Sequence, residues 1–134
     1  MEIKTGTITQ KVVINATPEG VYHALMDSKI HSKFTGSKAT IVPRVNGKIT
    51  AWDGYIMGKN LELVKGKKIV QEWITTEWPE DYPPSVLTIM LKKTGNKTEL
   101  KMIHSKVPKT QMKSYNDGWK EWYWTPLKDY FEDK

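Results

Sequence analysis

The chain has 134 residues, enough for one domain with a buried core, and 38% of them are hydrophobic, which argues against a disordered chain. It contains no cysteine, so disulfides, thiolate metal sites and a cysteine nucleophile are excluded. No apolar run approaches the roughly 20 residues that a membrane-spanning helix needs, and the N-terminus lacks the segments of a secretory signal. These features predict a single domain over residues 1–134, located in the cytoplasm and without a membrane partner.

The net charge of +6 raises the question of nucleic-acid binding. Of the 21 basic residues only Arg44 is an arginine, the side chain best suited to paired contacts with phosphate and guanine. The lysines are spread along the whole chain. We therefore expect a solvated, lysine-rich surface and no nucleic-acid partner.

The chain begins with the pattern of a strand followed by two short helices. Residues 7–15 alternate between apolar and polar side chains, as a strand does. Thr17 can cap a helix, and Pro18 suits the first helical position. A second short helical segment is expected in residues 27–36, ended by Gly36.

Residues 38–106 have the pattern of β-structure interrupted by turns. Asn46-Gly47 and Asp53-Gly54 are hairpin signals because these residues tolerate a positive φ. Strands are expected within residues 38–43, 48–52, 55–64, 67–75, 85–93 and 98–106.

The segment GYIMGKN, residues 54–60, has two glycines and a lysine, as phosphate-binding loops do. Such a loop needs four residues between its glycines, a Ser or Thr after the lysine, and a helix next. Here three residues separate the glycines, Asn60 follows the lysine, and LELV continues as a strand. We therefore expect a hairpin turn at Gly54, and a bulge or a close backbone approach at Gly58.

The last segment, about residues 109–133, changes to a helical period. Apolar and aromatic residues recur every three or four positions, which predicts a helix whose aromatic stripe packs on the sheet. Pro126 should kink this helix or remove one of its backbone hydrogen bonds. The stripe consists of Tyr115, Trp119, Trp122, Tyr123, Leu127, Tyr130 and Phe131.

The order of these elements predicts an α+β helix-grip fold of the START-like type. In this fold a curved antiparallel sheet of six to seven strands wraps around a long C-terminal helix, with a short helical pair after the first strand. The segments WDGYIMGKNLELVKGKKIVQEW, WP, SVLTIML, TELKMIH, VP and GWKEWYWTPLKDYF follow one another in this order. Together they resemble the C-terminal domain of the activator of the heat-shock protein 90 ATPase, over about residues 10–132.

This resemblance implies two kinds of binding function. The activator family implies a non-enzymatic domain that docks on a chaperone of the heat-shock protein 90 type and stimulates its ATP hydrolysis. The START-like superfamily implies, as an alternative, a binder of a small apolar ligand held between sheet and helix. Fold alone does not decide between them.

The candidate cavity residues are those expected to face the space between sheet and helix. The same residues could instead fill the core completely, because bulky rings shrink cavities. His104 could be a hydrogen-bonded core histidine or the polar group that orients a ligand. The candidates are Trp73, Ile89, Met102, His104, Trp119 and Tyr123.

The candidate partner-binding residues are Trp78 and Tyr82, in the proline-rich segment WPEDYPP. Aromatic side chains on a stiff loop are good anchors for a partner protein. Alternatively, Trp78 folds back and closes one end of the sheet.

No motif for catalysis or metal binding is present. The histidines His23, His31 and His104 lack metal-ligand spacing, and His31, beside Ser32 and Lys33, is expected to be exposed in a loop. No nucleophile motif occurs, so we expect no catalytic residues, no cofactor and no enzymatic activity. The alternative is a weak cyclase or hydrolase activity, since the START-like resemblance includes some enzymes. Glu62 and Glu72 are expected to form cross-strand ion pairs with lysines.

Overall fold

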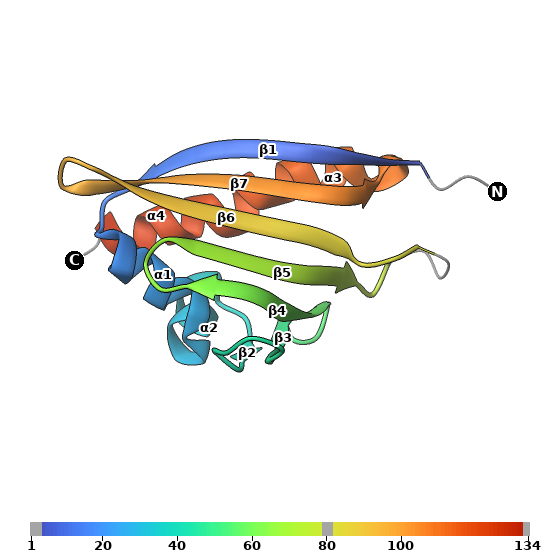
Figure 1. The fold of residues 1–134 in the computed structure, drawn as a ribbon, viewed down its shortest axis with the longest axis horizontal. Helices are drawn as coiled ribbons and strands as arrows, with labels where there is room; N and C mark the ends of the chain where they lie inside the picture. The colour runs from blue at the N-terminus through green and yellow to red at the C-terminus, as the bar shows by residue number, and fades with distance from the viewer. Residues whose placement is uncertain (1–3, 79–81, 133–134) are drawn as a thin grey trace.

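The structure, a computed structural model, describes residues 4–78 and 82–132 and shows one antiparallel sheet with the C-terminal helix lying across one face (Figure 1). The seven strands run in the order β1-β7-β6-β5-β4-β3-β2. They are β1 (Thr5–Ile14), β2 (Thr40–Ile41), β3 (Lys48–Ala51), β4 (Ile56–Val64), β5 (Lys68–Thr75), β6 (Ser85–Thr94) and β7 (Lys97–Pro108). The helices are α1 (Pro18–Met26), α2 (Ser28–Thr35), α3 (Met112–Gly118) and α4 (Thr125–Glu132), with a 3-10 turn at Lys109–Gln111 and a π-helical turn at Trp119–Trp124. The predicted helix-grip fold is confirmed.

The helical pair α1 and α2 forms through local capping, as predicted. The Thr17 hydroxyl accepts a hydrogen bond from the Gly20 N–H at 3.1 Å, and Pro18 takes the first helical position. The Asp27 carboxylate, between the two helices, accepts one from the Ile30 N–H at 3.0 Å. Gly36 ends α2 in the left-handed conformation, with φ of 76°.

The core lies between the inner face of the sheet and the helices. Along β6 and β7 the buried and half-buried side chains alternate, so every second residue faces the helices. The outer face of the sheet has no covering element among the described residues (Figure 1). Side chains that are almost completely buried include Ile14, Ile69, Leu87, Leu100, Met102 and Leu127.

Gly58 stands at a close approach between neighbouring backbones. A Cβ atom placed on it would lie 1.8 Å from the carbonyl oxygen of Glu72 on β5, so no other residue fits there. The irregularity in the β4–β5 pairing lies further along, between Asn60 and Glu62. The prediction of a close approach at Gly58 is therefore confirmed, and the bulge belongs to a neighbouring position.

The C-terminal helix contains a π-helical turn directly before Pro126. In that turn the Thr125 N–H bonds to the Lys120 carbonyl, five residues back, so one extra residue enters the helix. Proline has no N–H to donate, and the chain accommodates it without ending the helix. The extra residue changes which side chains face inward: Trp124 is buried, whereas Trp122 is 54% exposed. The expectation that Trp122 packs within the stripe is wrong for this reason.

Candidate functional site: an aromatic cavity between sheet and helix

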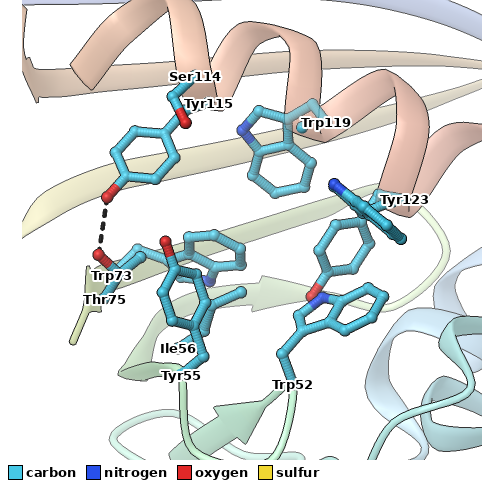
Figure 2. Close-up of a pocket in the computed structure, with 11 residues that line it drawn as sticks. Trp52, Tyr55, Ile56, Trp73, Thr75, Ser114, Tyr115, Trp119 and Tyr123 are labelled. Atoms are coloured by element: carbon cyan, nitrogen blue, oxygen red, sulfur yellow. Dashed lines mark hydrogen bonds between the residues drawn. The ribbon is translucent and has the colours of Figure 1, made fainter. Parts of the chain in front are cut away.

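A cavity of about 400 Å³ lies between the inner face of the sheet and the C-terminal helix (Figure 2). This volume falls within the roughly 300–1,000 Å³ typical of small-molecule sites. The sheet side supplies the rings of Trp52, Tyr55 and Trp73, and the helix side supplies those of Tyr115, Trp119, Trp122 and Tyr123. Ile56, Thr75, Ser114 and Gly118 complete the lining.

Three of these rings form a continuous aromatic wall. Trp73 on β5 and Trp119 on the helix are stacked, with ring centroids 4.9 Å apart and planes inclined by 25°. Tyr123 lies one turn further along, its ring centroid 4.8 Å from that of Trp119. A wall of stacked rings favours another flat ring over a bulky aliphatic group, because aromatic pairs gain from stacked and edge-on contacts beyond simple burial.

The rim of the cavity carries Trp52 and Trp122. Trp52 follows β3, where strand alternation would direct its side chain outward, but its φ of 54° turns the chain so that the indole lines the cavity. Asp53 and Gly54 continue this left-handed turn, with φ of 56° and 90°. The Trp52 and Trp122 rings meet edge-on, 5.8 Å apart. A strained backbone conformation at a bulky residue therefore places one wall of the cavity.

One end of the cavity is polar. The hydroxyl oxygens of Thr75 and Tyr115 lie 2.7 Å apart (Figure 2), and Tyr115 also donates to the Gln111 side-chain carbonyl at 2.7 Å. Tyr55 donates its phenolic proton to the Glu77 carboxylate. Burial raises the pKa of both Tyr55 and Tyr115, so both phenols stay neutral at neutral pH.

His104 is a buried histidine whose two ring nitrogens both have partners. The Trp119 indole N–H donates to Nδ1 at 3.1 Å, so the ring proton is on Nε2, which donates to the Ser85 hydroxyl at 2.7 Å. Ser85 in turn donates to the Trp73 carbonyl at 2.7 Å. Burial lowers the pKa of His104 to about 4, which keeps the ring neutral. His104 therefore holds the Trp73–Trp119 wall in place from behind.

His31 is buried on α2, so the expectation of an exposed loop residue is wrong. Its Nδ1–H donates to the Leu25 carbonyl at 3.1 Å, and its Nε2 accepts from the Tyr123 hydroxyl at 3.0 Å. Burial lowers the pKa of His31 and raises that of Tyr123. The polar neighbours in sequence misled the prediction, because on a helix the inward positions are His31 and Phe34, three residues apart.

The structure brings together only some of the predicted cavity residues. Trp73, Trp119 and Tyr123 line the cavity. Ile89 instead lines a separate void of about 30 Å³ deeper in the core. Met102 and His104 are buried, with exposures of 0% and 1%, and line neither space.

Several cavity residues escaped the sequence-based prediction. Thr75 could have been found, because it follows Trp73 by two residues and therefore shares its face of β5. Tyr115 was expected on the stripe without a role in the cavity. Nothing in the sequence pattern indicates Trp52 or Tyr55, since the positive φ angles at the β3–β4 turn reverse the alternation.

Of the predicted partner-binding residues, Trp78 lies near the polar end of the cavity. Trp78 stacks on Tyr115, with ring centroids 6.2 Å apart, and its indole N–H donates to the Pro83 carbonyl at 3.1 Å. This geometry resembles the alternative in which Trp78 folds back onto the end of the sheet. Tyr82 is half-buried. Residues 79–81 of the same loop lie outside the described residues.

Over residues 4–78 and 82–132, no cluster of three or more histidine and acidic side chains could hold a metal ion. In the same part of the chain, no helix has the length and apolar character required to cross a bilayer.

The profile of the family described as "Activator of Hsp90 ATPase homolog 1-like protein" matches residues 15–132. The chain belongs to this family. The human activator of 90 kDa heat shock protein ATPase homolog 1 is 29% identical over 131 residues, which is 98% of this chain. A homologue from Dictyostelium discoideum is 27% identical over 117 residues, or 87% of this chain. The chain spans only 38% of the human protein's length and 30% of that from Dictyostelium.

Solved structures of other members of this activator-like fold superpose closely. An Hsp90 activator from Plasmodium falciparum has a TM-score of 0.80 at 25% identity, covering 88% of this chain and 90% of its own. The Aha1 dimer from Colwellia psychrerythraea has a TM-score of 0.81 at 23% identity, covering 94% and 96%. DynU16, from a dynemicin biosynthetic locus, shares the fold with a TM-score of 0.79 at 14% identity, covering 95% of this chain and 47% of its own. The protein therefore has the helix-grip fold of its family.

Proposed function

We propose that this domain binds a chaperone of the heat-shock protein 90 class and stimulates its ATP hydrolysis without catalysing a reaction itself. The observation that carries the proposal is the family match over residues 15–132, together with curated relatives named as activators of that ATPase. Stimulation requires tighter binding to the hydrolysing conformation of the chaperone than to its other states. A binding role without catalysis agrees with the buried histidines, whose ring nitrogens are all engaged.

The outer face of the sheet supplies a basic docking surface for such a partner. Lys48 and Lys59, both exposed, lie opposite each other across the β3–β4 pair, and Lys11 and Lys101 do so across β1–β7. Like charges in opposed positions destabilise a sheet slightly, so an acidic partner gains by approaching them. Among the described residues, part of the basic charge on this face is balanced by the Lys11–Glu99 pair at 3.7 Å and the cross-strand Lys68–Glu62 pair at 3.4 Å, and Glu72 stands opposite Lys59 in the β4–β5 pairing.

The test is the steady-state ATPase of the host's own chaperone of this class, titrated with the protein. We expect saturable stimulation that weakens as ionic strength rises. A Lys59→Glu variant should need a higher concentration for half-maximal stimulation. The matched control is Lys120→Glu, the same charge reversal on the C-terminal helix, which lies on the other side of the sheet; it should behave as the wild type. A flat titration with folded wild-type protein would rule out the proposal.

The loop residues Trp78 and Tyr82 are proposed as further contacts with the chaperone. A Tyr82→Ala variant removes one aromatic anchor of the loop, and we expect it to weaken stimulation. Trp78→Ala should do the same, but Trp78 also stacks on Tyr115. Unfolding curves of both variants therefore accompany the titration, so that lost contact and lost stability are told apart.

A second candidate function is the binding of a small apolar ligand, and the aromatic cavity itself favours it. We propose 2-methylnaphthalene as a probe, added to protein carrying nitrogen-15 in its indole rings. The indole N–H resonances of the cavity residues Trp73 and Trp119 should shift more than that of Trp124, which stacks on Trp119 but bonds to Gln10 outside the cavity. A Gly118→Leu variant, which places a side chain in the cavity lining, should abolish the shifts. Unchanged cavity resonances in the wild type would refute this candidate.

A further inference from the structure

At the polar end of the cavity, the donor and acceptor roles of the hydroxyl groups can be assigned by placing each hydroxyl proton in turn. The Gln111 amide nitrogen donates to the Glu77 backbone carbonyl at 2.9 Å, which fixes the orientation of the Gln111 amide. Its side-chain oxygen therefore faces the Tyr115 hydroxyl, 2.7 Å away. A carbonyl oxygen only accepts, so the single proton of Tyr115 points at Gln111.

The remaining two hydroxyl protons are then also determined. Because Tyr115 has no second proton, the 2.7 Å contact between Tyr115 and Thr75 requires Thr75 to be the donor. Tyr55 points its proton at the Glu77 carboxylate, which has no proton to give in return.

The hydroxyls of Tyr55, Thr75 and Tyr115 therefore have their protons committed to protein partners, whereas the fourth hydroxyl of the lining, that of Ser114, lies on the exposed side of the helix. A ligand at the first three hydroxyls can therefore bond only to the oxygen lone pairs of Tyr55, Thr75 and Tyr115. The nearby Glu77 carboxylate adds negative potential, which disfavours an anionic ligand group at this end. The oxygens of Tyr55, Thr75 and Tyr115 together form an acceptor site at this end of the cavity.

We propose that the cavity takes a flat aromatic ligand that carries a hydroxyl or N–H donor at one end, with its ring along the Trp73–Trp119 wall and its donor directed at Tyr55, Thr75 and Tyr115. The proposal rests on the second candidate function above and narrows it to a chemical class. Neutral phenols and heteroaromatic N–H compounds fit this site. Aromatic carboxylates do not, because their charge meets Glu77, and aromatic ethers do not, because they have no proton to donate to Tyr55, Thr75 or Tyr115.

Three probes of nearly equal shape separate these properties: 2-naphthol, 2-methylnaphthalene and 2-methoxynaphthalene. The first has a donor, the second has no polar group, and the third has an acceptor only. Dissociation constants are measured from the indole resonances of the labelled wild-type protein. We expect 2-naphthol to bind about three- to tenfold more tightly than the other two, the effect of one net hydrogen bond.

The assignment to particular residues is tested with Thr75→Val and Tyr55→Phe, alone and combined. Thr75→Val keeps the shape of the side chain, and Tyr115 keeps its bond to Gln111, so the variant is not expected to unfold. Both variants should reduce the preference for 2-naphthol and leave the affinity for 2-methylnaphthalene unchanged. Thr88→Val makes the same chemical change on the outer face of the sheet and should keep the full preference.

The binding results distinguish a failure of cavity binding, the candidate function on which this inference rests, from a failure of the inference alone. If no probe binds, cavity binding itself fails, and the inference fails with it. If all three bind equally, the cavity binds ligands but its polar end does not select them, and only the inference is overturned. If 2-methoxynaphthalene matches 2-naphthol, or if the combined variant keeps the preference, the proton assignment is wrong.

Discussion

The buried histidine His104 makes the stability of this protein depend on pH in a calculable way. Burial lowers its pKa in the folded state to about 4, against an ordinary value of 6.5. Between these two values the unfolded chain binds a proton that the folded protein does not, so stability falls as pH decreases. With those two pKa values, lowering the pH from about 7.5 to about 5 should remove about 2 kcal/mol of the free energy of unfolding through His104 alone. Burial lowers the pKa of His31 as well, so its contribution has the same sign.

The assay is urea unfolding followed by tryptophan fluorescence, at several pH values between about 5 and 7.5, a range chosen because most carboxylates titrate below it. A His23→Gln variant, at an exposed histidine, is measured beside the wild type. In parallel, the ring C–H resonances of His104 should not titrate until well below pH 6. A free energy of unfolding that stays constant across this range, or a His104 resonance that titrates near its ordinary pKa, would refute the reasoning.

Three substitutions test the backbone and capping arguments by chemical denaturation. Gly58→Ala should destabilise severely or prevent folding, because its Cβ would overlap the Glu72 carbonyl on the paired strand, and a stability near that of the wild type would contradict this. Gly118→Ala is the opposite case, because Gly118 is helical and a new Cβ would lie 3.7 Å from the nearest atom, on the Trp122 side chain. Alanine should therefore raise the free energy of unfolding by up to about 1 kcal/mol. Asp27→Ala removes the cap that accepts from Ile30 and should cost about 1 kcal/mol, whereas an unchanged midpoint would show that the cap is not needed.

Features that depend on neighbours in sequence were predicted correctly. The cap at Thr17, the proline at the first turn of α1 and the glycine that ends α2 each act within a few residues of themselves. The alternation along β6 likewise determines that Leu87 and Ile89 share one face, because successive strand side chains point to opposite sides. These local rules were sufficient for the order of elements and therefore for the fold.

The cavity could be predicted only in part. Trp73 and Trp119 follow the strand and helix periods, so their inward direction could be read from the sequence. Trp52 breaks the strand period through a positive φ, and the π-helical turn inserts one residue, so that Trp124 is buried and Trp122 stays half exposed at the rim of the cavity. His31 is buried through contacts with Tyr123, 92 positions away, which no pattern around it indicates.

The sequence by itself determined the strands, the helical pair, the aromatic C-terminal helix and hence the helix-grip architecture, because periodicity and capping are properties of short segments. Only the tertiary structure decided that the rings leave an open cavity and that the hydroxyls of Tyr55, Thr75 and Tyr115 lie together at one end of it. Thr75 and Tyr115 are 40 residues apart, and the directions of their protons follow from Gln111 and Glu77, which bond across the sheet–helix interface. Such a site depends on how separate elements pack, because hydrogen bonds between distant residues exist only after the chain has folded.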